Sequence, residues 1–308
     1  MTILVIGGTG NAGSAVTAAL ATKNVEVRVL ANKAAPSQKQ PRVDYVTGDV
    51  SDMDFMRTTL RDISTVFILN PVVADEANRA LLTLDLVEAA GIRRVVYFSM
   101  INADTFADVP HASAKFAAER AIERLRLPAT ILRPNYFFQN DLTQKMPLTT
   151  QQQYAMPIGS VGVEMVDTRD IAEIAAIELV RRETSPEPLP ANLIEIVGPE
   201  VFTGQSIAQL WSEVLGEPIT YAGDDLDAAE KNFGMQLPSA MAYDTALMFR
   251  GFHREGMLGS PGTAGRLAEM LGRPLRTYRA FAEEAAAGWR KPLLSKIADA
   301  VLPGRASR

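Results

Sequence analysis

Several residue types that catalytic and structural sites depend on are scarce in this chain of 308 residues. Cysteine is absent, and histidine occurs only at His111 and His253. The lack of cysteine excludes disulfide bonds, thiol nucleophiles and thiolate-ligated metals, and two histidines argue against a histidine-built metal site. The formal net charge of −5 shows no excess of positive charge, which argues against a general affinity for nucleic acid.

Long apolar runs are also missing. No segment approaches the roughly 20 apolar residues of a membrane span, so no membrane association is expected. The apolar start lacks a basic segment and breaks at Gly7, which is unlike a signal peptide. Apolar residues make up 47% and charged residues 22% of the chain, as in a globular protein. We therefore expect a cytoplasmic protein.

The start of the chain carries the most informative motif. Residues 3–6 are consecutive β-favouring apolar residues, as in a buried strand of a parallel sheet, and glycines follow at positions 7, 10 and 13. Apolar residues then recur at helical spacing up to Leu20. Glycine permits a tight turn and close backbone approach, and the helix N-terminus attracts a pyrophosphate. The alternative is an ordinary turn between a strand and a helix.

Further apolar runs predict strands over residues 25–30, 43–46, 65–69, 95–98, 129–132, 159–166 and 193–197. The order of strands and helices predicts an α/β fold, with a Rossmann-type doubly wound parallel sheet and a smaller C-terminal α+β substrate region. We expect the dinucleotide-binding domain over residues 1–157, with 186–198 returning to it. The substrate region would then comprise 158–185 and 199–308.

Ligands of such sheets bind outside the carboxyl ends of the strands. The candidates for cofactor binding therefore lie in the glycine turn, directly after predicted strands, or on the following helix: Gly7, Thr9, Gly10, Asn11, Ala12, Gly13, Asn32, Lys33, Asp49, Val50, Leu69, Asn70, Pro71, Ser99, Lys115, Pro134, Asn135 and Tyr136.

Two positions bear on the adenosine half of the cofactor. After the second strand, Asn32 and Lys33 stand where an Asp or Glu would bind the ribose of NAD. The missing carboxylate and the lysine favour NADP(H) over NAD(H), although Lys33 could instead be a solvated loop charge. Asp49 is placed to accept a hydrogen bond from an adenine amino group; alternatively, Asp49 or Ser51 caps the helix that contains Phe55.

Three residues are candidates for catalysis. His111 and Lys115 are four residues apart and would share one face of a helix. The imidazole is suited to proton transfer near neutral pH, and Lys115 to binding ribose hydroxyls or acting as the acid. Ser99 follows the fifth strand, where a side chain would point to the ligand crevice. The alternatives are a helix-start histidine, a solvated lysine and a structural serine.

The second half predicts helices and an apolar surface. Asp170 is placed to cap a helix beginning at Ile171, and Thr203 or Ser206 to start a core helix that Gly216 ends. Residues 133–140 suit a pocket wall or the core. The segment 224–265 is rich in Met and Phe, which suits a pocket for a flat apolar substrate, a lid or a dimer contact. Helices are expected over 264–271 and 278–289, and a loosely held tail with a short turn over 291–308.

Together, several segments resemble the NmrA-like branch of atypical short-chain dehydrogenases over nearly the whole chain. They are the turn over 7–13, Gly48-Asp49, the HxxxK of His111 to Lys115, Leu132-Arg133-Pro134-Asn135 and the run over 166–172. Many short-chain reductases have a Tyr four residues before the Lys, and His111 stands in its place here. Many relatives also carry an arginine where this chain has Asn32.

The resemblance implies one of two kinds of protein, because the branch contains NADP-dependent reductases and NADP-binding regulators without evident catalysis. Lys115 looks like the general acid or base of the plant reductases in it. We expect an NAD(P)-dependent oxidoreductase that prefers NADPH and transfers hydride to a small apolar carbonyl, enone, quinone or imine. A non-catalytic redox sensor is the main alternative, and an isomerase or epimerase that retains its cofactor is a third.

Overall fold

The computed structural model describes residues 2–32 and 40–301, with side chains up to Trp289. The predicted contact from Lys33 lies outside the described residues. A seven-stranded parallel sheet forms the centre of the protein, in the order β3-β2-β1-β4-β5-β6-β8. Its strands are β1 (Thr2–Ile6), β2 (Glu26–Ala31), β3 (Val43–Thr47), β4 (Thr65–Ile68), β5 (Val95–Phe98), β6 (Ala129–Pro134) and β8 (Asn192–Ile196). This is the predicted Rossmann-type doubly wound topology.

The strand order reverses between β1 and β4, which pair directly with Ile6 opposite Ile68. Strands β4 and β5 are buried at every position, and β1 at every position after Thr2. Burial on both faces explains why these strands are continuous apolar runs in the sequence. A reversal of this kind opens a crevice at the carboxyl edge of the sheet, where ligands of this fold bind.

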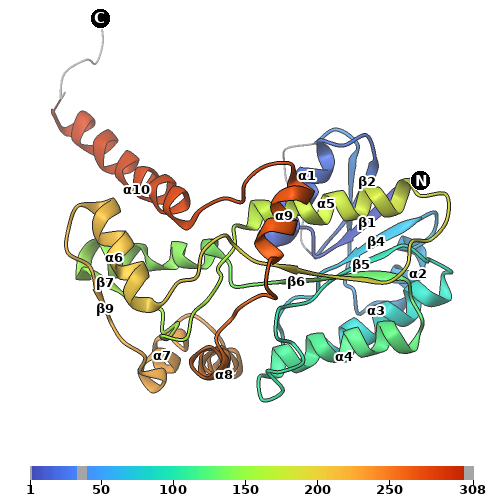
Figure 1. Cartoon of the computed structure of the whole chain (residues 1–308). Helices are drawn as coiled ribbons and strands as arrows, with labels where there is room; N and C mark the ends of the chain where they lie inside the picture. Colours follow the sequence, from blue (N-terminus) through green and yellow to red (C-terminus); the bar gives the residue numbers. More distant parts are fainter. Residues whose placement is uncertain (1, 33–39, 302–308) are drawn as a thin grey trace, which may run out of the picture.

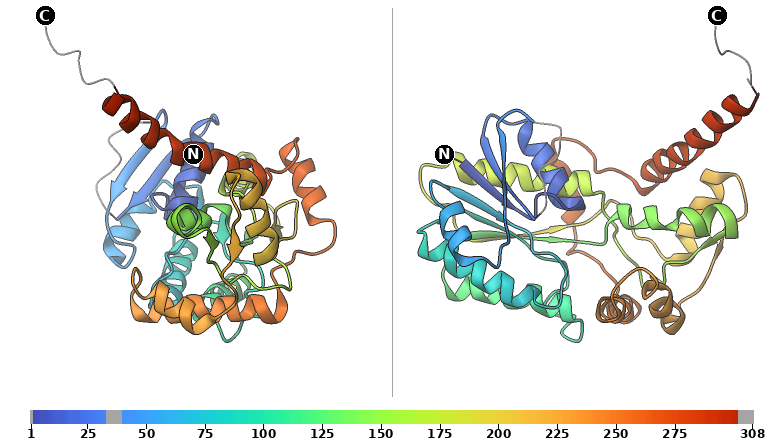
Figure 2. Two further views of the ribbon diagram at one scale, coloured as in Figure 1. Left: turned by 90° about the vertical axis from the view of Figure 1, so that its left-hand side faces the viewer. Right: turned by 180° about the vertical axis from the view of Figure 1, so that it is seen from behind.

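Helices cover both faces of the sheet (Figures 1 and 2). One face carries α1 (Asn11–Ala21) packed against α5 (Thr168–Thr184), with α9 (Thr263–Leu271) beside α5. The opposite face carries α2 (Met53–Thr59), α3 (Glu76–Ala89) and α4 (Pro110–Arg124), with α3 and α4 in contact. The core under α1 and α5 continues into the second half, so the two halves share one apolar interior.

Most elements of the second half lie beyond the carboxyl edge of the sheet (Figure 1). They are η1 (Phe138–Gln144), η2 (Pro147–Gln151), β7 (Gln153–Tyr154), α6 (Gly204–Leu215), β9 (Thr220–Tyr221), α7 (Leu226–Phe233), α8 (Ser239–Glu255) and α10 (Tyr278–Val301). Strands β7 and β9 pair in parallel. Among the described residues, no helix combines the length and apolar character needed to cross a bilayer.

The predicted core helix after Thr203 is confirmed. Thr203 and Ser206 form a reciprocal capping box at the start of α6, and Gly216 ends the helix in the left-handed conformation. Trp211 is fully buried, and its indole stacks on Trp289 at 5.2 Å between ring centroids. The apolar stripe of α6 therefore serves core packing.

Two local predictions are wrong. Residues 159–166 form only isolated bridges, because Gly159 and Gly162 have φ angles of 80° and 124°, which interrupt a strand. The N-cap of α5 is Asp167, whose carboxylate accepts a hydrogen bond from the Arg169 N–H. Asp170 instead lies in the first turn, buried beside Arg273 and Arg276.

The start of α2 and the end of the chain also differ from expectation. Asp52, not Asp49 or Ser51, is the N-cap of α2 and accepts hydrogen bonds from two backbone N–H groups. Helix α10 continues to Val301, where a loose tail with a short turn was expected. The domain boundaries stay a prediction, for which we propose grouping α5 with the sheet that it covers. Residues 147–154 then group with the second half, because β7 pairs with β9.

A buried carboxyl group joins three elements of the second half. Asp141 is fully buried in η1 and accepts hydrogen bonds from the hydroxyls of Tyr154 at 2.9 Å and Tyr278 at 2.5 Å. Tyr278 also accepts a hydrogen bond from the Trp211 indole at 3.0 Å. Burial raises the pKa of Asp141 to about 7, against the opposing effect of the two tyrosine hydrogen bonds.

This pKa makes a prediction about stability. An unfolded Asp titrates near pH 4, so the folded chain retains a proton that the unfolded chain releases between about pH 4 and pH 7. The contribution of Asp141 to stability is therefore present at low pH and is lost as the pH rises through 7. Between pH 5 and pH 7 the loss is about 2 kcal/mol, and Asp141→Asn should abolish it. Urea unfolding of both proteins at the two pH values measures the difference; an equal pH dependence in both would contradict the prediction.

Candidate functional site

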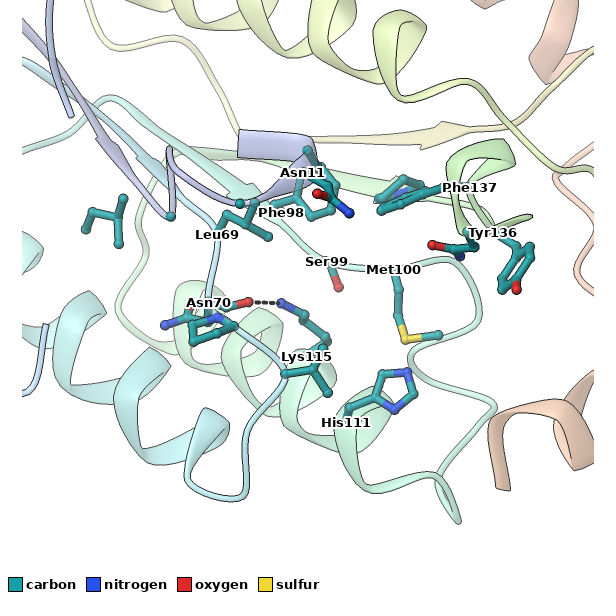
Figure 3. A pocket seen from close by; sticks show the side chains of 18 of the residues that line it. Asn11, Leu69, Asn70, Phe98, Ser99, Met100, His111, Lys115, Tyr136 and Phe137 are labelled. Atoms are coloured by element: carbon teal, nitrogen blue, oxygen red, sulfur yellow. Dashed lines mark hydrogen bonds between the residues drawn. The ribbon is translucent and has the colours of Figure 1, made fainter. Parts of the chain in front are cut away.

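A cavity of about 850 Å³ lies at the carboxyl edge of the sheet, where the strand order reverses (Figure 3). Most of the predicted site residues line it: Gly7, Thr9, Gly10, Asn11, Ala12, Asn32, Val50, Leu69, Asn70, Pro71, Ser99, His111, Lys115, Pro134, Asn135 and Tyr136. The lining residues that were not among these candidates are Ile6, Leu30, Val72, Phe98, Met100, Phe137, Asn140, Met248 and Met257. Two predicted cofactor residues, Gly13 and Asp49, are not in the lining.

The glycines of the first turn have different structural roles. Gly7 has a φ of 80°, and a Cβ there would lie 2.3 Å from the Leu69 carbonyl oxygen. A Cβ at Gly13 would lie 2.0 Å from the Gly7 carbonyl oxygen, so this glycine lets α1 pack on β1. A Cβ at Gly10 would meet nothing closer than 3.7 Å. Gly10 therefore keeps space open in the cavity, whereas Gly7 and Gly13 allow the turn to form.

The first turn of α1 is suited to bind an anion. Gly10 is the N-cap and supplies no side-chain acceptor to the N–H groups of the turn. Asn11 and Ala12 line the cavity directly after it. Free N–H groups and the positive end of the helix dipole favour a phosphate at this position.

Asn70, directly after β4, provides a second polar group without a hydrogen-bond partner among the described residues. Its side chain is 2% exposed, and neither its amide oxygen nor its amide nitrogen has a hydrogen-bond partner in the described structure. Such a group is costly unless a ligand or water pairs with it. Both polar features therefore fit a dinucleotide that lies along the carboxyl edge of the sheet.

Lys115 forms a buried ion pair that the sequence did not reveal. Its ammonium lies 2.8 Å from a carboxylate oxygen of Glu76 on α3, and the two side chains are 6% and 2% exposed. The ammonium also donates to the Asn70 carbonyl at 3.3 Å (Figure 3), and it lies 5.9 Å from the centroid of the Tyr97 ring. Burial raises the pKa of Glu76, while the nearby Lys115 opposes this rise. The pair fixes the lysine at the cavity wall.

Ser99 has a fixed hydrogen bond below the cavity. Its hydroxyl donates to Glu119 at 2.5 Å, and Glu119 accepts two hydrogen bonds from the guanidinium of Arg133. These hydrogen bonds raise the pKa of Arg133. The Ser99 proton is therefore committed to Glu119, and only the hydroxyl oxygen remains for a ligand.

Helix α4 carries three of the polar groups of the site. His111, Lys115 and Glu119 occur at four-residue intervals and so lie along one helix face. Each meets a partner from another element: Asp244 of α8, Glu76 of α3, and Arg133 of β6. The distance from His111 Nδ1 to the Asp244 carboxylate is 2.6 Å.

The other end of the cavity is apolar. Phe137 and Met100 line it (Figure 3), and Met248 and Met257 line it from the second half of the chain. Asn135 fixes the position of Met257 in this wall, because its side-chain amide donates a hydrogen bond to the Met257 carbonyl at 2.8 Å. Within the segment 224–265, Phe249 and Phe252 are core residues, and Met235 is 74% exposed. Only part of this segment therefore contributes to the cavity.

Comparison with known proteins decides the family. The model of the NmrA-like family matches residues 1–271. The chain belongs to the NmrA-like family. An NAD(P)H azoreductase from Xenophilus azovorans is 25% identical over 292 residues, which cover 93% of this chain and 99% of that protein. Festuclavine synthase I from Penicillium roqueforti is 25% identical over 301 residues, covering 94% of this chain and 100% of the synthase.

Solved structures of NmrA-like and related proteins share the fold. A quinone oxidoreductase from Escherichia coli in complex with NADPH superposes with a TM-score of 0.80 at 19% identity, covering 92% of this chain and 99% of the other. NmrA, a negative transcriptional regulator, in complex with NADP gives a TM-score of 0.77 at 17% identity, covering 95% and 97%. Both an enzyme and a regulator therefore have this architecture.

Proposed function

We propose that this NmrA-like protein is an NAD(P)H-dependent reductase that transfers hydride to a small, flat, uncharged acceptor. The observation that carries the proposal is the continuity of one cavity. It extends from the glycine turn, which is suited to phosphates, past Lys115 and His111 to a chamber walled by methionine and aromatic side chains. A cofactor and an apolar acceptor would thus meet beside two groups that hold or move protons.

The cofactor would lie along the carboxyl ends of β1, β4 and β5. The N–H groups at the start of α1 would bind its pyrophosphate, and the unpaired amide of Asn70 would bind its nicotinamide half. Lys115 would donate to ribose hydroxyls from the position that Glu76 fixes. A reduced nicotinamide bound there supplies the hydride, and the chain's residues orient it and exclude water.

The names of related proteins support this chemistry. The azoreductase and the quinone oxidoreductase are named for conjugated acceptors and for NAD(P)H or NADPH. A triphenylmethane reductase from Citrobacter, solved with NADP(H), has the same fold at a TM-score of 0.77 and 18% identity, with 92% of this chain and 100% of that chain covered. An acceptor with an extended flat π-system would match the methionine and aromatic wall described above.

The charges at the cavity predict which acceptors are reduced. Among the described lining residues, Lys115 is the one side chain with a permanent charge, and Glu76 neutralises it. A sulfonate or carboxylate would lose its hydration there without gaining a free cation. We expect a neutral quinone or azo dye to be reduced with kcat/KM about tenfold above that of its sulfonated counterpart.

The assay follows the loss of NADPH absorbance with matched neutral and sulfonated acceptors. A heat-inactivated sample and a reaction without acceptor are the controls. Turnover of the sulfonated compound at the same rate would contradict the charge argument. No acceptor-dependent turnover with any compound of the panel would contradict the reductase proposal.

A preference for NADPH is part of the proposal. Asn32, after β2, lines the cavity where a carboxylate would repel a 2′-phosphate. Asn32→Asp should therefore lower kcat/KM for NADPH about tenfold and leave that for NADH unchanged or higher. Asn232→Asp makes the same change on the exposed surface of α7 and serves as the control. An equal effect of Asn32→Asp on both cofactors would count against the assigned position.

The phosphate position is tested by Gly10→Ala. The backbone at Gly10 has φ −80° and ψ 175°, which alanine adopts without strain, and the new methyl group would project into open cavity space. We expect NADPH affinity to fall at least about tenfold, because the methyl group would occupy the place of the pyrophosphate. Gly265→Ala in α9, where the new Cβ would meet no atom within 4 Å, should leave affinity unchanged. Isothermal titration measures both, and unchanged binding by Gly10→Ala would be the contrary result.

One observation favours a second candidate function. Lys115 is held by Glu76 and the Asn70 carbonyl, and no tyrosine precedes it by four residues, so the usual short-chain reductase pair is missing. A nucleotide sensor would bind NADP⁺ and NADPH with different affinity and show no acceptor-dependent oxidation. The NADP complex of the regulator NmrA is a precedent for binding of this kind.

A further inference from the structure

We propose that Asp244 is a positioning residue that fixes the imidazole of His111, so that His111 delivers the proton to the hydride acceptor. This rests on the proposed reductase function. Asp244 belongs to α8 in the second half of the chain, 133 residues from its partner on α4. The two residues are distant in the sequence, and folding of the chain brings them into contact.

The carboxylate of Asp244 holds His111 at two points. One oxygen lies 2.6 Å from the ring Nδ1, and the other accepts a hydrogen bond from the His111 backbone N–H at 3.2 Å. The N-cap of α4, Val109, has no side chain able to bind these N–H groups, so Asp244 takes that place. The side chains of His111 and Asp244 are 13% and 11% exposed, which limits competition from water.

This contact determines the tautomer of the ring. A carboxylate accepts hydrogen bonds and donates none, so Nδ1 carries the proton when the ring is neutral. Nε2 has no hydrogen bond to any other described residue, and His111 lines the cavity close to Met100 (Figure 3). Nε2 is therefore the nitrogen available to a bound acceptor.

The charges facing the imidazole come from three helices. They are Asp244 on α8, Glu76 on α3 and Lys115 on α4. Glu76 and Lys115 form a pair with each other, so Asp244 supplies the nearest unbalanced negative charge. With Nδ1 held by Asp244, a second proton taken up by the ring is carried on Nε2 and faces the acceptor.

The proton balance of the step follows. The acceptor gains the hydride at one atom, with its electron pair, and gains the Nε2 proton at the atom where negative charge develops. NADPH is thereby oxidised to NADP⁺, and His111 becomes neutral with its remaining proton on Nδ1 beside Asp244. Solvent water then returns a proton to Nε2.

Helix α8 links this function to the acceptor wall. Met248 lies one turn after Asp244 on the same helix and lines the cavity. A single helix thus supplies both part of the acceptor wall and the group that orients His111.

The first test measures tautomers by ¹⁵N NMR of histidine-labelled protein without cofactor or acceptor, and so does not depend on activity. His253 is the internal reference, because its Nε2 lies 2.8 Å from the Pro157 carbonyl and must carry the proton. At a pH at which both rings are neutral, we expect His111 in the Nδ1–H form and His253 in the Nε2–H form. In Asp244→Ala, where no acceptor remains, the signal of His111 should change to that of the Nε2–H form.

The second test compares Asp244→Asn, which preserves the side-chain shape, with Asp224→Asn. Asp224 lies 3.2 Å from His253 and does not line the cavity, so it provides the same change beside the other histidine. We expect Asp244→Asn to lower kcat about tenfold with an unchanged KM for NADPH, and His111→Gln to lower it about a hundredfold. Asp224→Asn should leave kcat unchanged.

An Nε2–H signal for His111 in the unmodified protein, or an unchanged signal in Asp244→Ala, would overturn the proposal. A kcat unchanged by Asp244→Asn would overturn it as well. Absence of turnover in every protein would instead reject the reductase function, and the NMR signals would still decide whether Asp244 orients His111.

Discussion

The close contact between the first glycine turn and its neighbours is the constraint on which the site depends. Gly13 must face the Gly7 carbonyl, and Gly7 must face Leu69, because a Cβ at either glycine would overlap a backbone oxygen. These two contacts place the start of α1 at the point where the strand order of the sheet reverses. Its free N–H groups then face the same cavity as the ends of β4 and β5. A small displacement of this turn would separate the proposed phosphate position from the rest of the site.

Helix α4 organises the polar side of the cavity. Its residues Lys115 and Glu119 each meet an opposite charge from a different part of the fold, His111 meets the Asp244 carboxylate, and these contacts are largely shielded from water. Buried ion pairs contribute little net stability, but removal of one partner is costly, so they hold geometry more than they add free energy. The result is a row of oriented side chains below an otherwise apolar chamber.

The sequence predicted the sheet and the glycine turn well, since both depend on local signals. Continuous apolar runs mark strands buried on both faces, and glycine spacing marks the turn. Glu76 and Asp244 were missed because their partners are distant in the chain, and no local pattern distinguishes them from surface carboxylates. The capping error at α5 had a different cause: Asp167 and Asp170 are both chemically able to cap, and only the fold engages Asp170 with Arg273 and Arg276. The false strand over 159–166 came from counting apolar residues through two glycines with positive φ.

The methionines of the chamber come from three separate segments, at positions 100, 248 and 257. The methionine side chain is unbranched and rotates about three bonds at little cost in free energy. A wall built from several methionines therefore adjusts to the shape of a bound molecule. Rigid aromatic rings such as that of Phe137 lie among the methionines and would limit the thickness of a molecule bound in the chamber. As the acceptor chamber of the proposed reductase, it would select molecules by planarity and charge rather than by the pattern of their substituents.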